Sequence, residues 1–449
     1  MLYRKLETEL DKWKDNPYRK PLILRGARQV GKTSLIRKWG KTNYKELVEI
    51  NLEKKSNLDV FDKVQSVADF IKKANIITDK KILPGKSLLF IDEIQESKNV
   101  MELLRFFLEE RPDLHLIAAG SLLEAKMAGK WNVPVGRVEY MYLFPMTFLE
   151  YLQAVQKGNF LEQLKKAKIG KKIIGINFIE NHFKDYILTG GMPSVVNEYA
   201  ETGNFSEIKN TLSDLITSYE DDIGKYTAGS KRKYVEAILK IAPKFAGQLF
   251  NYENFGDLGY KSREVSEAIQ KLEQVRLLNQ VKAINSISTP LSYKHKRAKK
   301  MIWLDNGLVN QVNDAFQPIS EGLYQGRIME QIVGQTLIAS GARRKFELAY
   351  WARNKDEGSA EVDFCWQYKN IIVGLEVKSG NSKNLKSLFS MIDIGGDKVV
   401  PVRASWDELR VEKYQYNGKS YKILSIPFYL LERINELVEF GSQGKEKIS

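Results

Sequence analysis

One eight-residue motif restricts the fold more than any other feature of the sequence. Residues 26–33 read Gly-Ala-Arg-Gln-Val-Gly-Lys-Thr, a complete G-x-x-x-x-G-K-T pattern. The apolar run Pro21–Gly26 before it predicts a buried strand, and Ser34–Trp39 after it predicts a helix. Glycines let backbone N–H groups curl around phosphate oxygens, and the positive end of the helix dipole faces the same point. The motif therefore predicts a strand–loop–helix unit that binds a nucleoside triphosphate.

The loop residues have separate predicted roles. Lys32 would contact the β- and γ-phosphates, and the Thr33 hydroxyl would ligate Mg²⁺. A glycine turn without a ligand is the alternative interpretation, which the flanking strand and helix disfavour. The predicted phosphate-binding residues are Gly26, Ala27, Arg28, Gln29, Val30, Gly31, Lys32, Thr33 and Ser34.

An acidic pair follows a second apolar run, Leu88–Ile91, at Asp92 and Glu93. The run predicts a buried strand, and its carboxyl end would place Asp92 near the phosphate loop as a magnesium ligand. Glu93 would then orient and polarise the attacking water as a general base. Two acids at a strand end are often only a solvated cap, but their occurrence after a phosphate loop favours the catalytic interpretation.

Two further residues are candidates for contact with the γ-phosphate. Ser121 ends a third apolar run and would hydrogen-bond the phosphate or the water; its alternative role is an N-cap of a helix at residues 122–125. Arg137 follows a glycine and would place a guanidinium on the phosphate, in cis or from a neighbouring subunit. An ordinary surface arginine is the alternative.

The chain has 449 residues, which is too long for a single hydrophobic core. Alternation of strand-like and helix-like segments predicts an α/β parallel sheet in the first part, and the pattern then becomes helical. Our expected fold class is an α/β P-loop NTPase sheet with a helical lid, followed by a winged-helix-like region and a C-terminal α/β domain. The expected boundaries are 1–145, 146–217, 218–290 and 291–449.

Charge and cysteine content restrict the partners and the environment. Seventy Lys and Arg against 56 Asp and Glu give a net charge of +14, which favours polyanionic partners. The single cysteine, Cys365, forbids an internal disulfide, and three histidines leave little for a zinc site. No apolar stretch approaches the roughly 18 residues of a membrane span, and no signal peptide is evident at the start. We expect a cytoplasmic protein without a membrane partner.

A second set of charged residues lies near the C-terminus. Residues 361–366 and 371–378 predict a hairpin in which Asp363 approaches Glu376, and period-two alternation puts Glu376 and Lys378 on one face. A helix from Gly326 would add Glu330. Carboxylate oxygens favour Mg²⁺ over zinc, so Asp363 and Glu376 are candidate metal ligands; Lys378 would position a water for attack on a phosphodiester. A charged, solvated hairpin is the alternative.

Residues 218–290 also contain a candidate nucleic-acid interface. A helix beginning at Ser262 presents Val265, Ile269 and Leu272 on one apolar face, and a strand-like segment follows, which suggests a winged helix. The basic loop 294–300 would grip DNA phosphates. Acidic residues on the same helix argue against DNA contact, so packing between domains is the alternative.

The ordered motifs resemble those of prokaryotic AAA-type ATPases. That group carries G-A-R-Q-V-G-K-T, a strand ending in Asp-Glu, a later Gly-Arg and a Gly-Gly-x-Pro turn, here Gly136-Arg137 and Gly190–Pro193. The resemblance extends over nearly the whole chain. It implies ATP with Mg²⁺ as ligands, and it strengthens Arg137 as a phosphate contact. The Asp363, Glu376 and Lys378 pattern, with Glu330, is similar to the restriction-endonuclease-like fold.

Two functions are consistent with these features. The first is an ATP hydrolase whose nucleotide state controls a C-terminal, nuclease-like module that processes nucleic acid. The second is a nucleotide-gated binding or signalling protein whose C-terminal domain is an inactive interaction surface. Homo-oligomerization is compatible with both, because Arg137 would act in trans only between copies of the chain.

Overall fold

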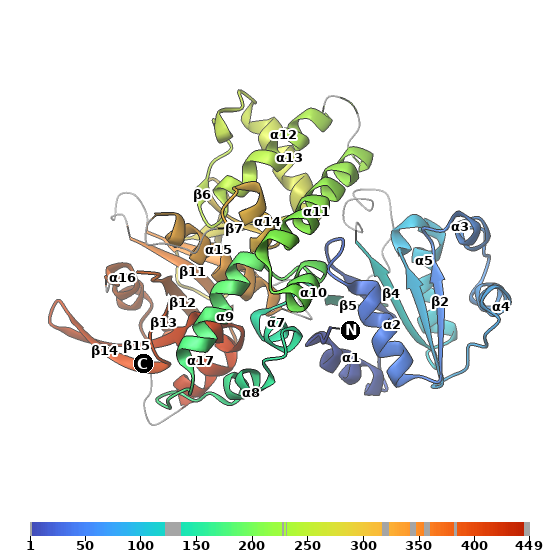
Figure 1. Cartoon of the computed structure of the whole chain (residues 1–449), viewed down its shortest axis with the longest axis horizontal. Coiled ribbons are helices and arrows are strands. Elements are labelled where there is room, and N and C mark those ends of the chain that lie inside the picture. Colours follow the sequence, from blue (N-terminus) through green and yellow to red (C-terminus); the bar gives the residue numbers. More distant parts are fainter. Residues whose placement is uncertain are drawn as a thin grey trace. The chain divides into compact units, whose positions relative to one another are not determined.

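A computed structural model describes residues 2–121, 136–226, 229, 231–316, 323–341, 347–353, 360–380 and 384–443. The chain forms two compact units (Figure 1). Of the described residues, unit 1 contains those up to 145, the short segment 274–277 and residue 341, and unit 2 contains the remainder. The long segment of unit 1 ends at Pro145.

Unit 1 is built on a five-stranded sheet in the order β2-β3-β4-β1-β5, and every strand pair in it is parallel. This confirms the α/β P-loop NTPase sheet expected from the sequence. Its elements are α1 (Leu6–Asp15), β1 (Leu22–Arg25), α2 (Lys32–Asn43), β2 (Glu46–Asn51), α3 (Lys55–Phe61), α4 (Val67–Thr78), β3 (Ser87–Asp92), η1 (Ile94–Glu96), α5 (Lys98–Glu110), β4 (His115–Gly120) and β5 (Glu139–Tyr142).

Helices cover both faces of this sheet, which is why its strands β3 and β4 are buried from end to end. Figure 1 shows α1 and α2 on one side and α5 on the other. Every residue of β3 and β4 is buried. One core joins alternate strand residues such as Ile23 and Ile91 to Phe70 of α4 and Phe107 of α5. The continuous apolar runs in the sequence therefore reflect burial on two faces.

Unit 2 begins with helices, as the sequence predicts for residues 146–217. Short 3₁₀ turns η2 (Ala242–Phe245), η3 (Phe255–Asp257), η4 (Gly396–Lys398) and η5 (Phe428–Arg433) also occur in this unit. Its α-helices are α7 (Phe148–Ala154), α8 (Gly158–Lys166), α9 (Ile176–Thr189), α10 (Pro193–Thr202), α11 (Phe205–Tyr226), α12 (Lys231–Ile241), α13 (Ser262–Gln274), α14 (Asn306–Val312), α15 (Leu323–Ala339), α16 (Lys386–Gly395) and α17 (Ile434–Gln443).

The Gly190–Pro193 turn separates α9 from α10, and its glycines are required by close approach. A Cβ on Gly190 would lie 2.1 Å from Oδ1 of Asp305, and one on Gly191 would lie 2.0 Å from the Met146 carbonyl oxygen. The buried Asp305 accepts a hydrogen bond from the Gly191 amide at 2.6 Å. The turn therefore joins the helices after residue 146 to the segment before α14.

The second sheet differs from the expected arrangement of separate domains. Its ten strands follow the order β14-β15-β13-β12-β11-β10-β7-β9-β6, with β8 paired to β7. The strands are β6 (Leu249–Phe250), β7 (Leu278–Ile284), β8 (Tyr293–Lys294), β9 (Lys299–Trp303), β10 (Ala349–Ala352), β11 (Glu361–Tyr368), β12 (Ile371–Val377), β13 (Val399–Ser405), β14 (Arg410–Tyr416) and β15 (Lys419–Pro427).

Strand β7 explains why the winged-helix-like region and the C-terminal part are continuous. It pairs antiparallel with β9, as the wing of a winged helix would, and parallel with β10. The predicted boundary at residue 290 thus falls between two paired strands. Strand pairing of this kind depends on which edges meet in space, and single-sequence patterns do not report it.

Candidate functional sites

The phosphate-loop motif forms the predicted connection between β1 and α2. Gln29 has φ 60° and Gly31 has φ 91°, so the backbone turns through left-handed conformations. A Cβ on Gly26 would lie 2.3 Å from the Leu143 carbonyl oxygen. Ala27 and Val30 bury their side chains, which leaves their backbone groups for the loop. The loop thus requires left-handed backbone conformations at Gln29 and Gly31 and the absence of a side chain at Gly26.

Lys32 lies within this loop and its side chain is buried. Its Nζ donates to the carbonyl oxygens of Gly26 and Ala27 at 3.0 and 2.8 Å. Burial lowers the pKa of Lys32 to about 8, and the nearby carboxylates of Glu93 and Asp92 oppose that shift. The ammonium is thus held at the loop by carbonyl groups, and no carboxylate of the described residues forms an ion pair with it.

Thr33 and Asp92 meet at the carboxyl edge of the sheet. The Thr33 hydroxyl donates to Oδ2 of Asp92 at 2.8 Å. Burial raises the pKa of Asp92 to about 6, although the Thr33 hydrogen bond lowers it. The strand that carries Asp92 is separated from β1 by β4. Two hard oxygen ligands at this separation fit Mg²⁺, which binds through one or two protein oxygens and its own water.

Glu93 adopts a left-handed backbone conformation with φ 52°, which turns its side chain out of the strand direction. Its Oε2 accepts hydrogen bonds from Nε2 of Gln95 and, at 3.5 Å, from the Ser121 hydroxyl. Ser121 follows β4 and is buried. Its alternative role as an N-cap involves residues 122–125, which lie outside the described residues. The structure therefore brings Glu93 and Ser121 together.

Sequence reasoning missed Gln95, which holds the Glu93 carboxylate. Gln95 is buried, and its Oε1 has no hydrogen-bond partner among the described residues. The available signal was its position two residues after Glu93 in Asp-Glu-Ile-Gln, where the η1 turn brings the two side chains together.

Arg137 lies far along the sheet from the phosphate loop. Leu22, the first residue of β1, pairs with Glu139 of β5, so Arg137 precedes the amino edge of the sheet. Its Nε lies 3.5 Å from the Glu109 carboxylate, and its side chain is about half exposed. The loop follows the opposite, carboxyl edge. This position disfavours contact with a nucleotide in the same chain, and it is compatible with contact in trans and with an ordinary surface arginine.

The other loop residues lie where a strand-to-helix turn puts them. Arg28 makes an exposed ion pair with Glu53 at 3.4 Å, and Ser34 is exposed in the first turn of α2. The charge of Arg28 is near enough to Lys32 to contribute to the lowering of its pKa, after the larger effect of burial.

The second set of charged residues lies at the β11–β12 hairpin, as predicted. Phe364 pairs with Leu375, and the next residues in this register are Asp363 and Glu376. Oδ2 of Asp363 accepts from the Val377 amide at 2.8 Å. Lys378 Nζ donates to Oε1 of Glu376 at 2.7 Å. The predicted approach of the two acids and the common face of Glu376 and Lys378 are both present.

Lys300 is the residue of this cluster that sequence reasoning misplaced. It was expected in the basic loop 294–300, on DNA phosphates, yet only 2% of its side chain is exposed. Its Nζ donates to Oε2 of Glu330 at 2.6 Å and lies 3.4 Å from Oδ1 of Asp363. Lys300 begins a run of buried residues that continues to Trp303 at the end of β9, and the lysine-rich sequence gives no sign of this strand.

Burial perturbs the acids of the cluster strongly. It raises the pKa of Glu330 to about 7, against the opposing charge of Lys300. It also raises the pKa of Glu376 to about 8, with a further contribution from Asp363. For Lys300 burial lowers the pKa, but Asp363 and Glu330 outweigh it, so that the pKa lies above its usual value. Such perturbed groups are typical of functional sites and also of structural ion pairs.

No group of three or more His, Cys, Asp or Glu in the described part of the chain is arranged to hold a metal ion. Glu330 and Asp363 are both paired with Lys300, and Glu376 is paired with Lys378. Oε2 of Glu376 is buried and has no hydrogen-bond partner within the described residues. Two carboxylates fit Mg²⁺ only if water completes the coordination, which is usual for this ion.

The candidate nucleic-acid surface is less basic than its sequence suggests. On α13, Arg263 is paired with Glu267 at 3.0 Å, and Lys231 of α12 reaches the same acid at 2.8 Å. Val265, Ile269 and Leu272 are buried as expected. In the basic loop, Lys294, His295 and Lys296 are exposed, whereas Arg297 donates to the Arg353 carbonyl oxygen.

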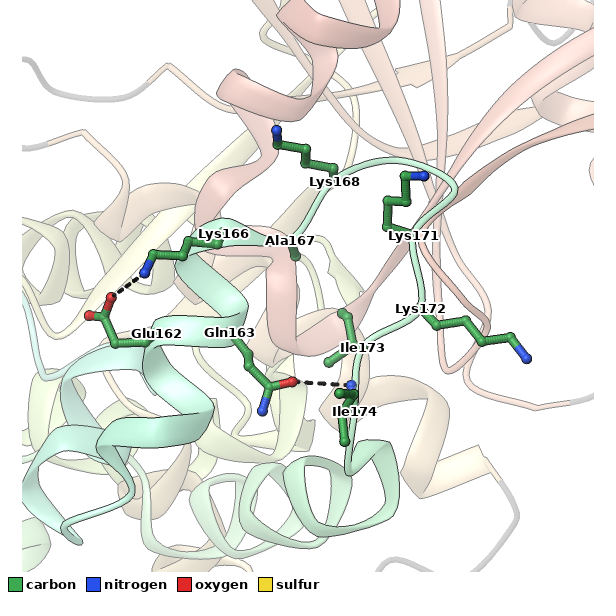
Figure 2. Close-up of a pocket in the computed structure, with 9 residues that line it drawn as sticks. All are labelled: Glu162, Gln163, Lys166, Ala167, Lys168, Lys171, Lys172, Ile173 and Ile174. Atoms are coloured by element: carbon green, nitrogen blue, oxygen red, sulfur yellow. Dashed lines mark hydrogen bonds and ion pairs between the residues drawn. The ribbon is translucent and has the colours of Figure 1, made fainter.

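Another lysine-rich region surrounds a cavity of about 320 Å³ between the end of α8 and the following loop. Its ammonium groups, on Lys166, Lys168, Lys171 and Lys172, point in different directions (Figure 2). Lys166 is also paired with Glu162. The lysines therefore do not converge on a single anion.

Within the described residues, no helix is both long enough and apolar enough to cross a membrane.

Comparison with protein families assigns the first unit. Residues 18–152 match the AAA domain model. Together with the all-parallel sheet and the phosphate loop, this match shows an AAA-type P-loop ATPase domain. Residues 180–318 and 325–429 match two domains of unknown function, DUF8612 and DUF4143.

Individual proteins add no functional information. An uncharacterized protein of Methanocaldococcus jannaschii, MJ1637, is 23% identical over 429 residues, which cover 91% of this chain and 85% of that protein. The Thermotoga maritima RuvB Holliday junction branch migration motor is 18% identical, with 66% and 93% of the two chains covered and a TM-score of 0.31. A Pyrococcus horikoshii signal transduction ATPase with numerous domains (STAND) is 14% identical, with 75% and 45% covered and a TM-score of 0.28. TM-scores this low support no conclusion about function.

Proposed function

We propose that this protein is a Mg²⁺-dependent ATP hydrolase whose nucleotide state controls its C-terminal module. The observation that carries the proposal is the hydrogen bond between Thr33 and Asp92, with Glu93 at the same edge of the sheet. ATP is preferred to GTP because no guanine-specific Asn-Lys-x-Asp run follows the loop.

Each site residue of the first unit has a defined role in this proposal. The amides of the loop bind the phosphate chain, and the Lys32 ammonium exchanges its two carbonyl partners for phosphate oxygens. Thr33 and Asp92 hold Mg²⁺, which would neutralise charge that develops on the phosphates. Glu93 accepts a proton from the attacking water, while Gln95 and Ser121 orient its carboxylate.

Substitution of Glu93 tests this assignment. Glu93→Gln should bind ATP normally but lose about 10²–10⁴-fold in turnover, because the amide accepts no proton. Binding is measured by calorimetry and turnover by phosphate release. Glu102→Gln, on the exposed surface of α5 near Lys98, is the matched control. Undiminished turnover in Glu93→Gln would refute the assignment of the general base.

Arg137 would act only between subunits. Its position at the amino edge of the sheet supports a role in a neighbouring copy, so we infer that turnover depends on homo-oligomerization. Specific activity that stays constant over a hundredfold dilution of the protein would contradict this role.

A second candidate function is divalent-ion-dependent cleavage of a phosphodiester by unit 2. It is favoured by the convergence of Asp363, Glu376 and Lys378 at one hairpin, with Glu330 nearby. The succession α15, β10, β11, β12, α16, β13, antiparallel in its first pairs and parallel in its last, supports the restriction-endonuclease-like assignment.

DNA cleavage tests the second candidate. Cleavage that requires Mg²⁺ and disappears in Asp363→Ala would support it. If cleavage is absent in both proteins, while ATP changes the oligomeric state, unit 2 is an interaction domain of a nucleotide-gated protein. Filter binding of duplex and single-stranded DNA at low salt tests a role of the exposed loop residues 294–296 in DNA contact.

A further inference from the structure

We propose that the Lys300 ammonium permanently occupies one cation position of the carboxylate cluster, so that the cluster takes one divalent cation and not two. This inference rests on the carboxylate site of the second candidate function and defines how many ions that site holds. It assigns a role to a residue that the motif of Asp363, Glu376 and Lys378 does not contain.

The surroundings of Lys300 Nζ resemble a cation site made of oxygen atoms. The ammonium has three donors, and three oxygens surround it: Oε2 of Glu330 at 2.6 Å, the Asp363 carbonyl oxygen at 3.2 Å and Oδ1 of Asp363 at 3.4 Å. The Phe364 ring lies 4.9 Å from the same nitrogen. Carboxylate and carbonyl oxygens are the ligands that hard divalent cations prefer. Lys300 thus saturates a set of ligands that an ion would otherwise use.

A second cation position remains beside the first. Oδ2 of Asp363 accepts from the Val377 amide, and Oε1 of Glu376 accepts from Lys378. Glu376 is only 7% exposed, and its buried Oε2 has no hydrogen-bond partner within the described residues. A buried carboxylate oxygen normally has a partner. A cation between Glu376 and Asp363 would supply it.

Formal charge supports a single ion. With its three carboxyl groups ionised, the set of Glu330, Asp363 and Glu376 faces the two ammonium groups of Lys300 and Lys378, which leaves one excess negative charge. Glu361 also interacts with Lys300 and Asp363 of the cluster, and the charge of Arg297 offsets its own in this count. One divalent cation brings the cluster to one positive charge, which suits an anionic phosphodiester. Two would leave three positive charges in a largely buried site, which is costly.

Mn²⁺ binding to the full-length protein without nucleotide tests the inference. Equilibrium dialysis compares the parent, Lys300→Met and Lys300→Arg, each with and without Asp363→Asn, so that only ions that require Asp363 are counted. We expect one such ion in the parent and in Lys300→Arg, and two in Lys300→Met. Lys299→Met is the matched control, because that lysine lies over the Tyr252 ring and not in the cluster.

Thermal unfolding provides an independent measurement. Without Mn²⁺ the unfolding midpoint of Lys300→Met should lie below that of the parent, because loss of the ammonium leaves buried carboxylates unpaired. Addition of Mn²⁺ should raise the midpoint of Lys300→Met more than the midpoint of the parent. If Lys300→Met folds only with Mn²⁺, that requirement itself supports the inference.

Three results would overturn the inference. The first is that the parent binds two ions that require Asp363. The second is that the parent and Lys300→Met bind equal numbers of these ions with equal affinities. No ion in any variant would refute both the inference and the carboxylate site. Failure of DNA cleavage alone, with the expected ion numbers, would remove only the nuclease function.

Discussion

Replacement of His115 by Phe should make unit 1 less sensitive to acid. The His115 ring is buried between the rings of Trp13 and Tyr44, at centroid distances of 5.9 and 5.2 Å. Neither ring nitrogen has a hydrogen-bond partner within the described residues. Burial, with smaller contributions from Arg19 and Lys14, lowers the pKa of His115 from 6.5 to about 4.

The sign follows from proton binding in the two states. Between about pH 6.5 and pH 4 the unfolded chain binds a proton at His115 that the folded protein excludes. The folded state therefore keeps its full stability above pH 6.5 and loses stability as the pH decreases below that value. A shift of this size gives a loss of about 2 kcal/mol between pH 7 and pH 5. His115→Phe removes this loss and keeps the aromatic packing. It also removes an unpaired buried N–H, which should add about 1 kcal/mol at both pH values.

Urea unfolding at pH 7 and pH 5, followed by tryptophan fluorescence, measures the difference between the parent and His115→Phe. Other titrating groups cancel in this comparison because both proteins contain them. We expect the advantage of His115→Phe to grow by about 2 kcal/mol at the lower pH. The same difference at both pH values would refute the claim that the folded protein holds this imidazole neutral.

Three further substitutions test other parts of the structure. Gln95→Ala should reduce ATP turnover less than Glu93→Gln does and should retain ATP affinity, since Gln95 acts through Glu93. Phosphate release measures the turnover and calorimetry the affinity. An unchanged turnover rate would contradict the role of Gln95. Gly26→Ala should weaken ATP binding measured by calorimetry, because its Cβ would clash with the Leu143 carbonyl oxygen. Gly191→Ala should destabilise unit 2 by about 1–3 kcal/mol in thermal unfolding, through the clash with the Met146 carbonyl oxygen, whereas Gly158→Ala, with open space around it, should be neutral.

Local patterns in the sequence were sufficient for the phosphate loop and the acidic strand end of the first unit. The order of strand, glycine loop and helix requires only neighbouring residues, and Asp92 and Glu93 stand at the end of a strand whose apolar run is unambiguous. Residues 361–378 also predicted their hairpin correctly, because alternation places Glu376 and Lys378 on one side. These features depend on contacts of short range along the chain.

Other features required knowledge of which strands become neighbours. The insertion of β4 between β1 and β3, and the amino-edge position of Arg137, follow from strand order, which no local pattern reports. The sharing of β7 between two partner strands likewise joined regions that were expected to be separate.

The sequence by itself determined the phosphate loop, the acids that face it and the acidic hairpin, because each is encoded within a few residues by periodicity and backbone requirements. Only the tertiary structure decided the fate of Lys300, which belongs to a basic stretch by composition but is buried against Glu330 and Asp363. A charged side chain takes its environment from residues distant in the chain, and those become its neighbours only when the sheet has formed.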